Sequence, residues 1–307
     1  MKAILVPADF SECSAAAYSY ASLLAEKTKA KIYLLHVLDI ADPAQWAGGE
    51  EETAYDVHFM MTIMKLTKSR MNKIRSNEIF KNTDVEEIIE RGSIPVRIFD
   101  AVQKYKIDVI VMGTHGVKGF QDKFLGTNAE KIVRDAEVPV LSVKHVMKNP
   151  TLDTIVLATD FSKETEYVLP VVTDIADMFK AKLILSKVVT PNDFQSTHEV
   201  EKQIKLFKEK NKSNNYTTII YYDYSKAEGI RRLANKAEAD LIALGTHGRH
   251  GVAHFFNGSI AEDVVNHSSL PVLTINFHKK LMKGQAEISV KKEHAYDSDI
   301  LYQIPSV

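Results

Sequence analysis

The sequence has a single cysteine and almost no net charge, and each scarcity excludes a class of protein. Cys13 alone cannot form an intrachain disulfide or a cysteine-based zinc site. We expect it to be a small buried residue rather than a reactive thiol. With 39 basic and 40 acidic residues, the net charge of −1 gives no sign of the basic face that a duplex-DNA binder needs. We therefore expect no nucleic-acid partner.

Long apolar runs are missing as well. The first residues, MKAILVPADF, break at Pro7 and Asp9 before they reach the length of a signal-peptide core. No apolar run reaches the roughly 18 residues that a membrane-spanning helix needs. We therefore expect a soluble cytoplasmic protein that does not interact with membranes. Its 307 residues, 45% of them hydrophobic and 26% charged, suffice for two ordinary globular domains.

Motifs of several nucleotide-using enzymes are also absent. PADFS follows the first apolar run, and no G-x-G-x-x-G, S-G-G-x-D or G-x4-G-K-[ST] loop follows it. No pair of carboxylates with a neighbouring base stands out as catalytic machinery. These absences argue against a nucleotidyltransferase, an ATP pyrophosphatase or a dehydrogenase.

What the sequence does contain is an internal repeat. A shift of 151 residues places the DFS of 9–11 on the DFS of 160–162. A shift of 132 residues places 113–143 on 245–275, with 13 of 31 positions identical and no gap. The first copy therefore carries about 19 extra residues between the two blocks, 151 minus 132. A repeat of this length indicates a duplicated domain rather than a solenoid unit.

Each copy alternates short apolar runs with helical segments. We expect strands at 3–6, 32–38, 85–90, 109–112 and 138–143, and again at 154–157, 183–189, 217–222, 241–244 and 270–275. Helices are expected after Ser11 for about 17 residues, at 55–76, after Ser93 and from Thr127. Apolar strands that alternate with helices predict an α/β fold of two open, five-stranded parallel sheets flanked by helices.

Three prolines add predictions about this fold. Pro139 and Pro271 stand near the starts of the fifth strands, which suits the edge of a sheet. An edge strand in each copy can pair with its counterpart, which predicts a pseudo-dimer within one chain. The sequence does not decide whether two chains also form a homodimer. Pro170 falls about eight residues into the first helix of the second copy, where it should kink or restart that helix.

The tetrapeptide GTHG follows the fourth apolar run of both copies, at 113–116 and 245–248. Nine residues separate it from Gly126-Thr127 in one copy and from Gly258-Ser259 in the other, so both contain G-x2-G-x9-G-[ST]. Ligands of open α/β sheets bind beyond the carboxyl ends of the strands. Glycines there let the backbone approach a phosphate, and the start of the next helix favours an anion. We infer a cradle for a di- or triphosphate.

The cradle also has a purely structural explanation. TNAE at 127–130 and SIAE at 259–262 are both capping boxes, in which the hydroxyl satisfies helix donors. The histidines of GTHG have no Ser or Cys partner in sequence, and we expect them to be turn residues. Basic residues between the glycines are either phosphate contacts or solvated side chains; these are Lys118, Lys123, Arg249, His250 and His254.

Two further pairs of residues end strands beside the same crevice. Asp9 and Asp160 follow the first strands and would accept from a ribose hydroxyl, hold a magnesium-bound water, or cap the first helix. Val37 and Val188 end the second strands, where they would face an adenine or belong to the core. The sequence leaves these alternatives open.

Together these features resemble the universal stress protein family. The resemblance is carried by the glycine motif, the VPADFS turn, the His36-Val37 pair and the PVL of the fifth strands. It covers residues 1–147 and 152–277 as a tandem pair, with a C-terminal extension at 278–307. It implies the ATP-binding branch of the family, with ATP, with or without Mg²⁺, as the ligand.

The resemblance assigns binding residues copy by copy. In the first copy it implies Pro7, Asp9, Val37, Met112 and Gly113 around the nucleoside, and Gly116, Gly126, Thr127 and Asn128 around the phosphates. In the second copy the matching residues are Asp160, Val188, Leu244, Gly245, Gly248, Gly258, Ser259 and Ile260. This sequence departs from the pattern at Ala158 (for Pro7), Lys187 (for His36) and Val117, where the family often has arginine and the second copy has Arg249.

The resemblance implies an adenine-nucleotide-binding regulatory protein of the stress response, with little or no catalysis and at most weak ATP hydrolysis. The alternatives are a slow ATPase or another nucleotide-using enzyme on the same fold, and a scaffold that acts through partner contacts. The acidic insertion at 39–61 contains Trp46 and is either a lid over the first site or a surface loop.

Overall fold

The computed structural model describes residues 1–307 except 40–53, 115–125, 148–149, 212–214, 247–257 and 277–307. The first half contains β1 (Ala3–Pro7), α1 (Glu12–Thr28), β2 (Lys31–Leu38), α3 (Ala54–Arg75), β3 (Val85–Arg91), α4 (Ile94–Lys104), β4 (Val109–Gly113), α5 (Thr127–Asp135) and β5 (Val140–Val143). The second half contains β6 (Thr154–Ala158), α6 (Thr165–Phe179), β7 (Lys182–Val189), α7 (Thr197–Lys210), β8 (Tyr216–Tyr222), α8 (Lys226–Lys236), β9 (Leu241–Thr246), α9 (Gly258–His267) and β10 (Val272–Asn276). Both halves thus alternate strand and helix in the predicted order.

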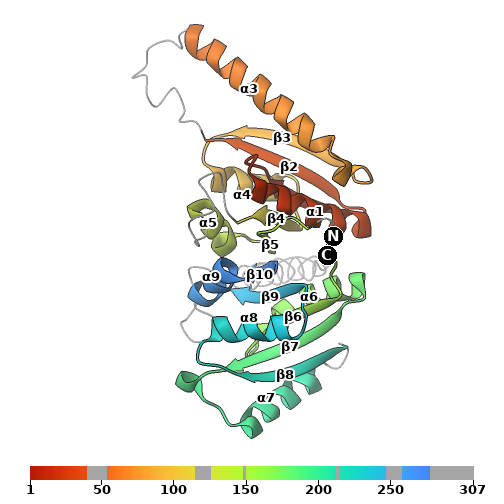
Figure 1. The fold of residues 1–307 in the computed structure, drawn as a ribbon, viewed down its shortest axis with the longest axis vertical. Coiled ribbons are helices and arrows are strands. Elements are labelled where there is room, and N and C mark those ends of the chain that lie inside the picture. The colour runs from red at the N-terminus through yellow and green to blue at the C-terminus, as the bar shows by residue number, and fades with distance from the viewer. Residues whose placement is uncertain (40–53, 115–125, 148–149, 212–214, 247–257, 277–307) are drawn as a thin grey trace, which may run out of the picture.

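One sheet runs through both halves of the molecule (Figure 1). Its 10 strands lie in the order β3-β2-β1-β4-β5-β10-β9-β6-β7-β8. All neighbours are parallel except β5 and β10, which pair antiparallel. The predicted pseudo-dimer is confirmed, because the fifth strands of the two copies join the two parallel halves into a continuous sheet.

Both faces of the sheet are apolar. In β1, Ile4 and Val6 face the layer that contains α1, α3, α6 and α7, whereas Ala3 and Leu5 face the layer of α4, α5, α8 and α9. Strands buried on both faces are continuously apolar rather than alternating, which is what the sequence shows. Each hydrophobic layer includes residues of both halves, so the halves share their core.

The start of each fifth strand is set by a proline. β5 begins directly after Pro139 and β10 directly after Pro271. Each proline carbonyl still accepts a ladder hydrogen bond, from Ile110 N at 2.9 Å and from Ile242 N at 3.0 Å. A proline has no N–H to donate, so both strands start later than we predicted from the apolar pattern.

Pro170 does not break its helix. α6 is continuous from Thr165 to Phe179, with exposed Pro170 inside it. The helix instead begins later than the Ser162 expected from the repeat, after a turn in which Thr165 N bonds Ser162 O at 3.2 Å. Pro170 therefore lies in the second turn of the helix, on its solvent side, where one missing hydrogen bond is tolerated.

Candidate functional site

The carboxyl ends of the central strands form one edge in each half. The strand order reverses between β1 and β4 in the first half and between β6 and β9 in the second. In open α/β sheets this reversal point is where ligands bind. Pro7, Val37, Met112 and Gly113 lie at or near the ends of their strands at this edge in the first half.

The turn after the first strand has the same unusual backbone in both halves. Phe10 has a φ of 64° and its counterpart Phe161 a φ of 60°, a left-handed conformation that is rare for a bulky residue. Asp9 Oδ1 accepts from Ser11 N at 3.0 Å and from Ser11 Oγ at 2.6 Å. Asp160 Oδ1 likewise accepts from Ser162 N at 3.0 Å. The local explanation of these carboxylates, a bond to the following serine, therefore holds in both copies.

His36 closes the end of β2 against this turn. Its Nδ1 lies 2.6 Å from Ala8 O, and its ring stacks on Phe10 with centroids 4.3 Å apart. A carbonyl oxygen can only accept, so Nδ1 carries the proton. Burial lowers the pKa of His36, and Arg70 adds to the effect, against the opposing influence of the Ala8 bond and of Asp9. His36, one of the residues that carry the family resemblance, is thus a neutral ring that holds the turn through its contacts with Ala8 and Phe10.

Gly113 has a packing role that the sequence did not reveal. A Cβ at this position would lie 2.3 Å from Cys13 O and 2.8 Å from Ser14 N, both in the first turn of α1. The helix therefore approaches β4 so closely that only glycine fits. Met112, the preceding residue of the implied site, is buried in the core.

The start of α5 differs from the predicted capping box. Gly126 occupies the N-cap with φ −61° and ψ 146°, and no side chain caps the helix. Thr127 is the first helical residue, and the predicted reciprocal partner Glu130 pairs with Arg134 at 3.2 Å instead. The predicted start of the helix at Thr127 is confirmed, and the capping-box alternative for this residue is wrong. Gly126, Thr127 and Asn128 are all exposed.

In the second half, α9 begins at Gly258, so Ser259 lies inside the helix rather than at its cap. Ile260 is half-buried, and Leu244 is fully buried in the core beside Gly245 at the end of β9. α5 thus starts near the strand ends with no side-chain cap on its first-turn N–H groups. Such N–H groups and the helix dipole attract anions.

A pocket of about 210 Å³ opens at the carboxyl ends of β6 and β7. Two of the implied site residues, Asp160 and Val188, line it. The sequence did not predict the others, which are Ala158, Thr159, Ser186, Lys187, Asp193, Phe194, Gln195, Lys226 and Ile230. They come from β6, β7, the segment after β7, and α8, so the pocket lies at the strand ends where the second nucleotide site was predicted.

Charged side chains inside this pocket are held by specific contacts. Lys187 is 6% exposed, and its Nζ donates to Gln195 Oε1 at 2.5 Å and to Gln203 Oε1 at 2.6 Å. Burial lowers the pKa of Lys187, against the attraction of Asp160 and Asp193. Lys226 Nζ lies 2.6 Å from Asp193 Oδ2. In the sequence, only the presence of Lys187 at the position equivalent to His36 had indicated that this pocket differs from the first site.

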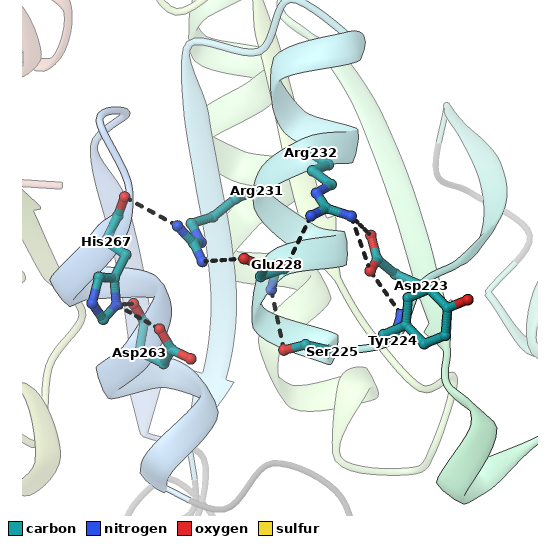
Figure 2. A network of polar contacts seen from close by, with 8 residues as sticks. All are labelled: Asp223, Tyr224, Ser225, Glu228, Arg231, Arg232, Asp263 and His267. Atoms are coloured by element: carbon teal, nitrogen blue, oxygen red, sulfur yellow. Dashed lines mark hydrogen bonds and ion pairs between the residues drawn. The ribbon is translucent and has the colours of Figure 1, made fainter.

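Helix α8 forms one wall of the pocket and packs closely on β7. A Cβ at Gly229 would lie 2.6 Å from Val188 Cγ1, so the helix sits against the valine that lines the pocket. The start of α8 is tied down by Arg232, which reaches Asp223 Oδ2 at 3.1 Å (Figure 2). Arg231 Nη1 reaches the carbonyl of His267 at the end of α9 at 3.5 Å. This network holds the wall in place.

Part of the predicted cradle lies outside the described residues. This applies to the second glycines, Gly116 and Gly248, to both GTHG histidines, and to the basic residues that follow them. The insertion from 40 to 53 and the extension at 278–307 also lie outside them.

Among the described residues, no group of three or more His, Cys, Asp or Glu side chains lies close enough together to hold a metal ion. No described helix is both long and apolar enough to cross a membrane.

Comparison with known proteins gives a consistent picture. The model of the Usp (universal stress protein) family matches residues 1–144 and again 151–276. Universal stress protein Slr1230 of Synechocystis is 24% identical over 290 residues, which cover 89% of this chain and 99% of that protein. Universal stress protein MJ0531 of Methanocaldococcus jannaschii is 28% identical over 151 residues, 48% of this chain and 84% of its own.

Solved structures agree on the fold. The crystal structure of a universal stress protein from Archaeoglobus fulgidus has a TM-score of 0.72 at 21% identity, covering 89% of this chain and 98% of that one. A functionally unknown protein from Pseudomonas aeruginosa, PA1789, has a TM-score of 0.61 at 19% identity, covering 95% and 98%. At these identities the likeness concerns the fold alone.

Proposed function

The chain belongs to the universal stress protein family, and from this premise we propose that it is a regulatory protein that binds adenine nucleotide, with one candidate site in each half. The observation that carries the proposal is the pocket at the ends of β6 and β7, lined by Asp160 and Val188. The pocket includes the carboxyl end of β6, the strand that borders the reversal of strand order at which α/β sheets bind nucleotides.

The described residues fit such a ligand chemically. The apolar side chains Val188 and Ile230 offer a surface for a base, and the Asp160 carboxylate can accept from a ribose hydroxyl. The exposed start of α5 in the first half has no side-chain cap, so its backbone N–H groups are available to phosphate oxygens. Mg²⁺ would arrive with the polyphosphate, whose oxygens are the ligands that this ion prefers.

We further propose that the protein holds the nucleotide as a signal and hydrolyses it slowly if at all. Asp9 and Asp160 are each engaged by the next serine of their turn, whose N–H donates to Oδ1. His36, the titratable ring near the first site, donates to Ala8 O rather than facing a second acid. General-base catalysis needs such a group within reach of the water.

The direct test is to look for bound nucleotide. Protein purified without added ligand is heat-denatured, and the supernatant is analysed by absorbance and chromatography; released ATP or ADP is the expected result. Calorimetry with Mg-ATP then gives the stoichiometry. Gly116→Val and Gly248→Val should each remove one site while far-UV circular dichroism stays unchanged. An unaltered stoichiometry in both variants would refute the cradle, and rapid turnover of ATP would favour an enzyme.

A further inference from the structure

The continuous sheet has two outer edges, and these edges differ in charge. Among the described residues, β3 ends the sheet in the first half and β8 ends it in the second (Figure 1). The sequence of β3 is VEEIIER, in which four of seven residues are charged, whereas that of β8 is YTTIIYY, without charge or proline. Charged residues and prolines keep an edge strand from pairing with another chain. β8 therefore lacks the protection that β3 has.

The backbone of β8 presents hydrogen-bonding groups on its outer side. Asp223 N, directly after the strand, donates to Val189 O of β7 at 3.1 Å. Successive residues of a strand direct their N–H groups to opposite sides, so that of Ile219 faces β7, and those of Thr218 and Ile220 face outward. No described strand pairs with this outer side. Such a row of unpaired groups is a template for a further strand.

A groove of about 720 Å³ lies between α7 and β8. Ile204 of the helix lines it together with Thr218 and Ile220, the two strand residues whose N–H groups face outward. A strand added to this edge would place every second side chain over the same groove. The edge can therefore accept both the backbone and the side chains of a further strand.

Helix α7 runs antiparallel to β8 along this groove. At one end, Thr197 Oγ1 lies 2.8 Å from the Tyr222 hydroxyl. At the other, Lys208 Nζ lies 6.0 Å from the centre of the Tyr216 ring. The middle of this helix segment is therefore level with Thr218, in the middle of the exposed edge.

The charges along the groove complement their own reversal. The helix contributes Glu201, Lys205, Lys208 and Glu209. Among the residues that the structure describes, none of these four takes part in an ion pair. If a second copy approaches with its helix reversed, about an axis near Thr218, Glu201 of each copy comes to Lys208 of the other. Two Glu–Lys pairs then form, one on each side of the axis.

We propose that β8 of two chains pair antiparallel about a two-fold axis near Thr218, so that the protein is a dimer with one sheet running through both chains. The chain joins its own halves in the same way, through β5 and β10. Identical edges that meet about a two-fold axis form an isologous interface. The partner is a second copy rather than an unrelated extended peptide, because the charges of the groove match their own reversal.

The test measures the oligomeric state of the full chain by sedimentation and locates the interface by hydrogen–deuterium exchange. Thr218→Pro removes an outward N–H and leaves the ladder to β7 in place. Thr218→Lys brings two like charges together at the axis and serves where proline disturbs the fold. Glu201→Lys reverses one charge, and Glu201→Lys with Lys208→Glu exchanges the pair. Lys202→Glu, at an exposed position of α7 outside the groove, is the control.

We expect a dimer in which the protection of 216–222 rises with protein concentration. Thr218→Pro or Thr218→Lys should give a monomer with unchanged far-UV circular dichroism. Glu201→Lys should weaken the dimer about tenfold, because it replaces two attractive pairs by two repulsive ones, and Lys202→Glu should not. The exchanged pair should restore the dimer. Since residues 201 and 208 are about 10 Å apart along one helix, this rescue requires a contact between chains.

A monomer at every concentration overturns the inference, and so does a dimer in which 216–222 is unprotected. A dimer that persists in both Thr218 variants does the same. A monomer with 216–222 always protected would show that the chain covers this edge itself. None of these outcomes bears on the proposed nucleotide binding, because the substituted residues do not line the pocket at β6 and β7.

Discussion

Leu141 of β5 lies directly opposite Leu273 of β10 in the antiparallel ladder that joins the halves. These two residues are also equivalent in the repeat, because 141 plus 132 is 273. An approximate two-fold axis therefore passes between them, and each copy uses the same strand to meet the other. Such self-complementary pairing is the geometry of an isologous dimer, here within one chain.

This ladder should couple the unfolding of the halves. Leu273→Pro removes a ladder N–H from a strand that is paired on both sides, and it leaves a carbonyl unsatisfied at a cost of about 1–3 kcal/mol. We expect the wild type to unfold in one calorimetric transition, and Leu273→Pro to unfold in two transitions or in one at a clearly lower temperature. Leu273→Ile is the control. One cooperative transition at the original temperature in Leu273→Pro would show that the ladder does not couple the halves.

The two glycines around the first cradle should respond differently to alanine. At Gly113 a Cβ would lie 2.3 Å from Cys13 O, whereas at Gly126 nothing lies within 4 Å. Gly113→Ala should therefore lower the free energy of unfolding by several kcal/mol, and Gly126→Ala should change it by less than about 0.5 kcal/mol. Urea denaturation of both variants measures this difference. Equal stabilities would mean that α1 can move away from β4 without cost.

Gly229 should link packing to ligand binding in the second half. A methyl group there must displace Val188, whose Cγ1 would lie 2.6 Å away. We expect Gly229→Ala to lose about 1–2 kcal/mol of stability, since overpacking outweighs the better helix propensity of alanine, and to weaken nucleotide binding at the second site only. Arg97→Ala at the equivalent place of α4 is the matched control. Improved stability in Gly229→Ala would show that α8 has room to shift.

His36 should make the protein less stable in mild acid. Burial lowers its pKa in the folded state, so as the pH falls below about 6.5 the unfolded chain binds a proton before the folded one does. Stability is then lost as the pH falls from 7 towards the lowered pKa, by at most about 1.4 kcal/mol per pH unit. His36→Gln should flatten this part of the curve in urea titrations at pH 5 to 7. Parallel curves for the two proteins would mean that the ring takes up its proton freely when folded.

The positions of both candidate sites followed from local patterns. Asp9 and Asp160 end strands in the same DFS turn, and the structure keeps that turn with Phe10 and Phe161 in the same left-handed conformation. The capping-box alternative for Thr127 was wrong, because the N-cap falls one residue earlier than the S/T-x-x-E pattern places it. Gly126 takes the N-cap, and Glu130 finds Arg134, a partner one turn further along the helix. Local sequence patterns therefore predict where a helix starts more accurately than they predict which residue caps it.

What the sequence determined by itself is the duplication, the α/β class, the order of the elements and the edge at which the strands end. These depend on short-range periodicity, glycine and proline, all of which act over a few residues. Tertiary structure decided which side chains meet at that edge. Gln195 and Lys226 reach the second pocket from separate segments, and α1 closes on Gly113. Such contacts depend on the packing of distant elements, and no local spacing encodes them.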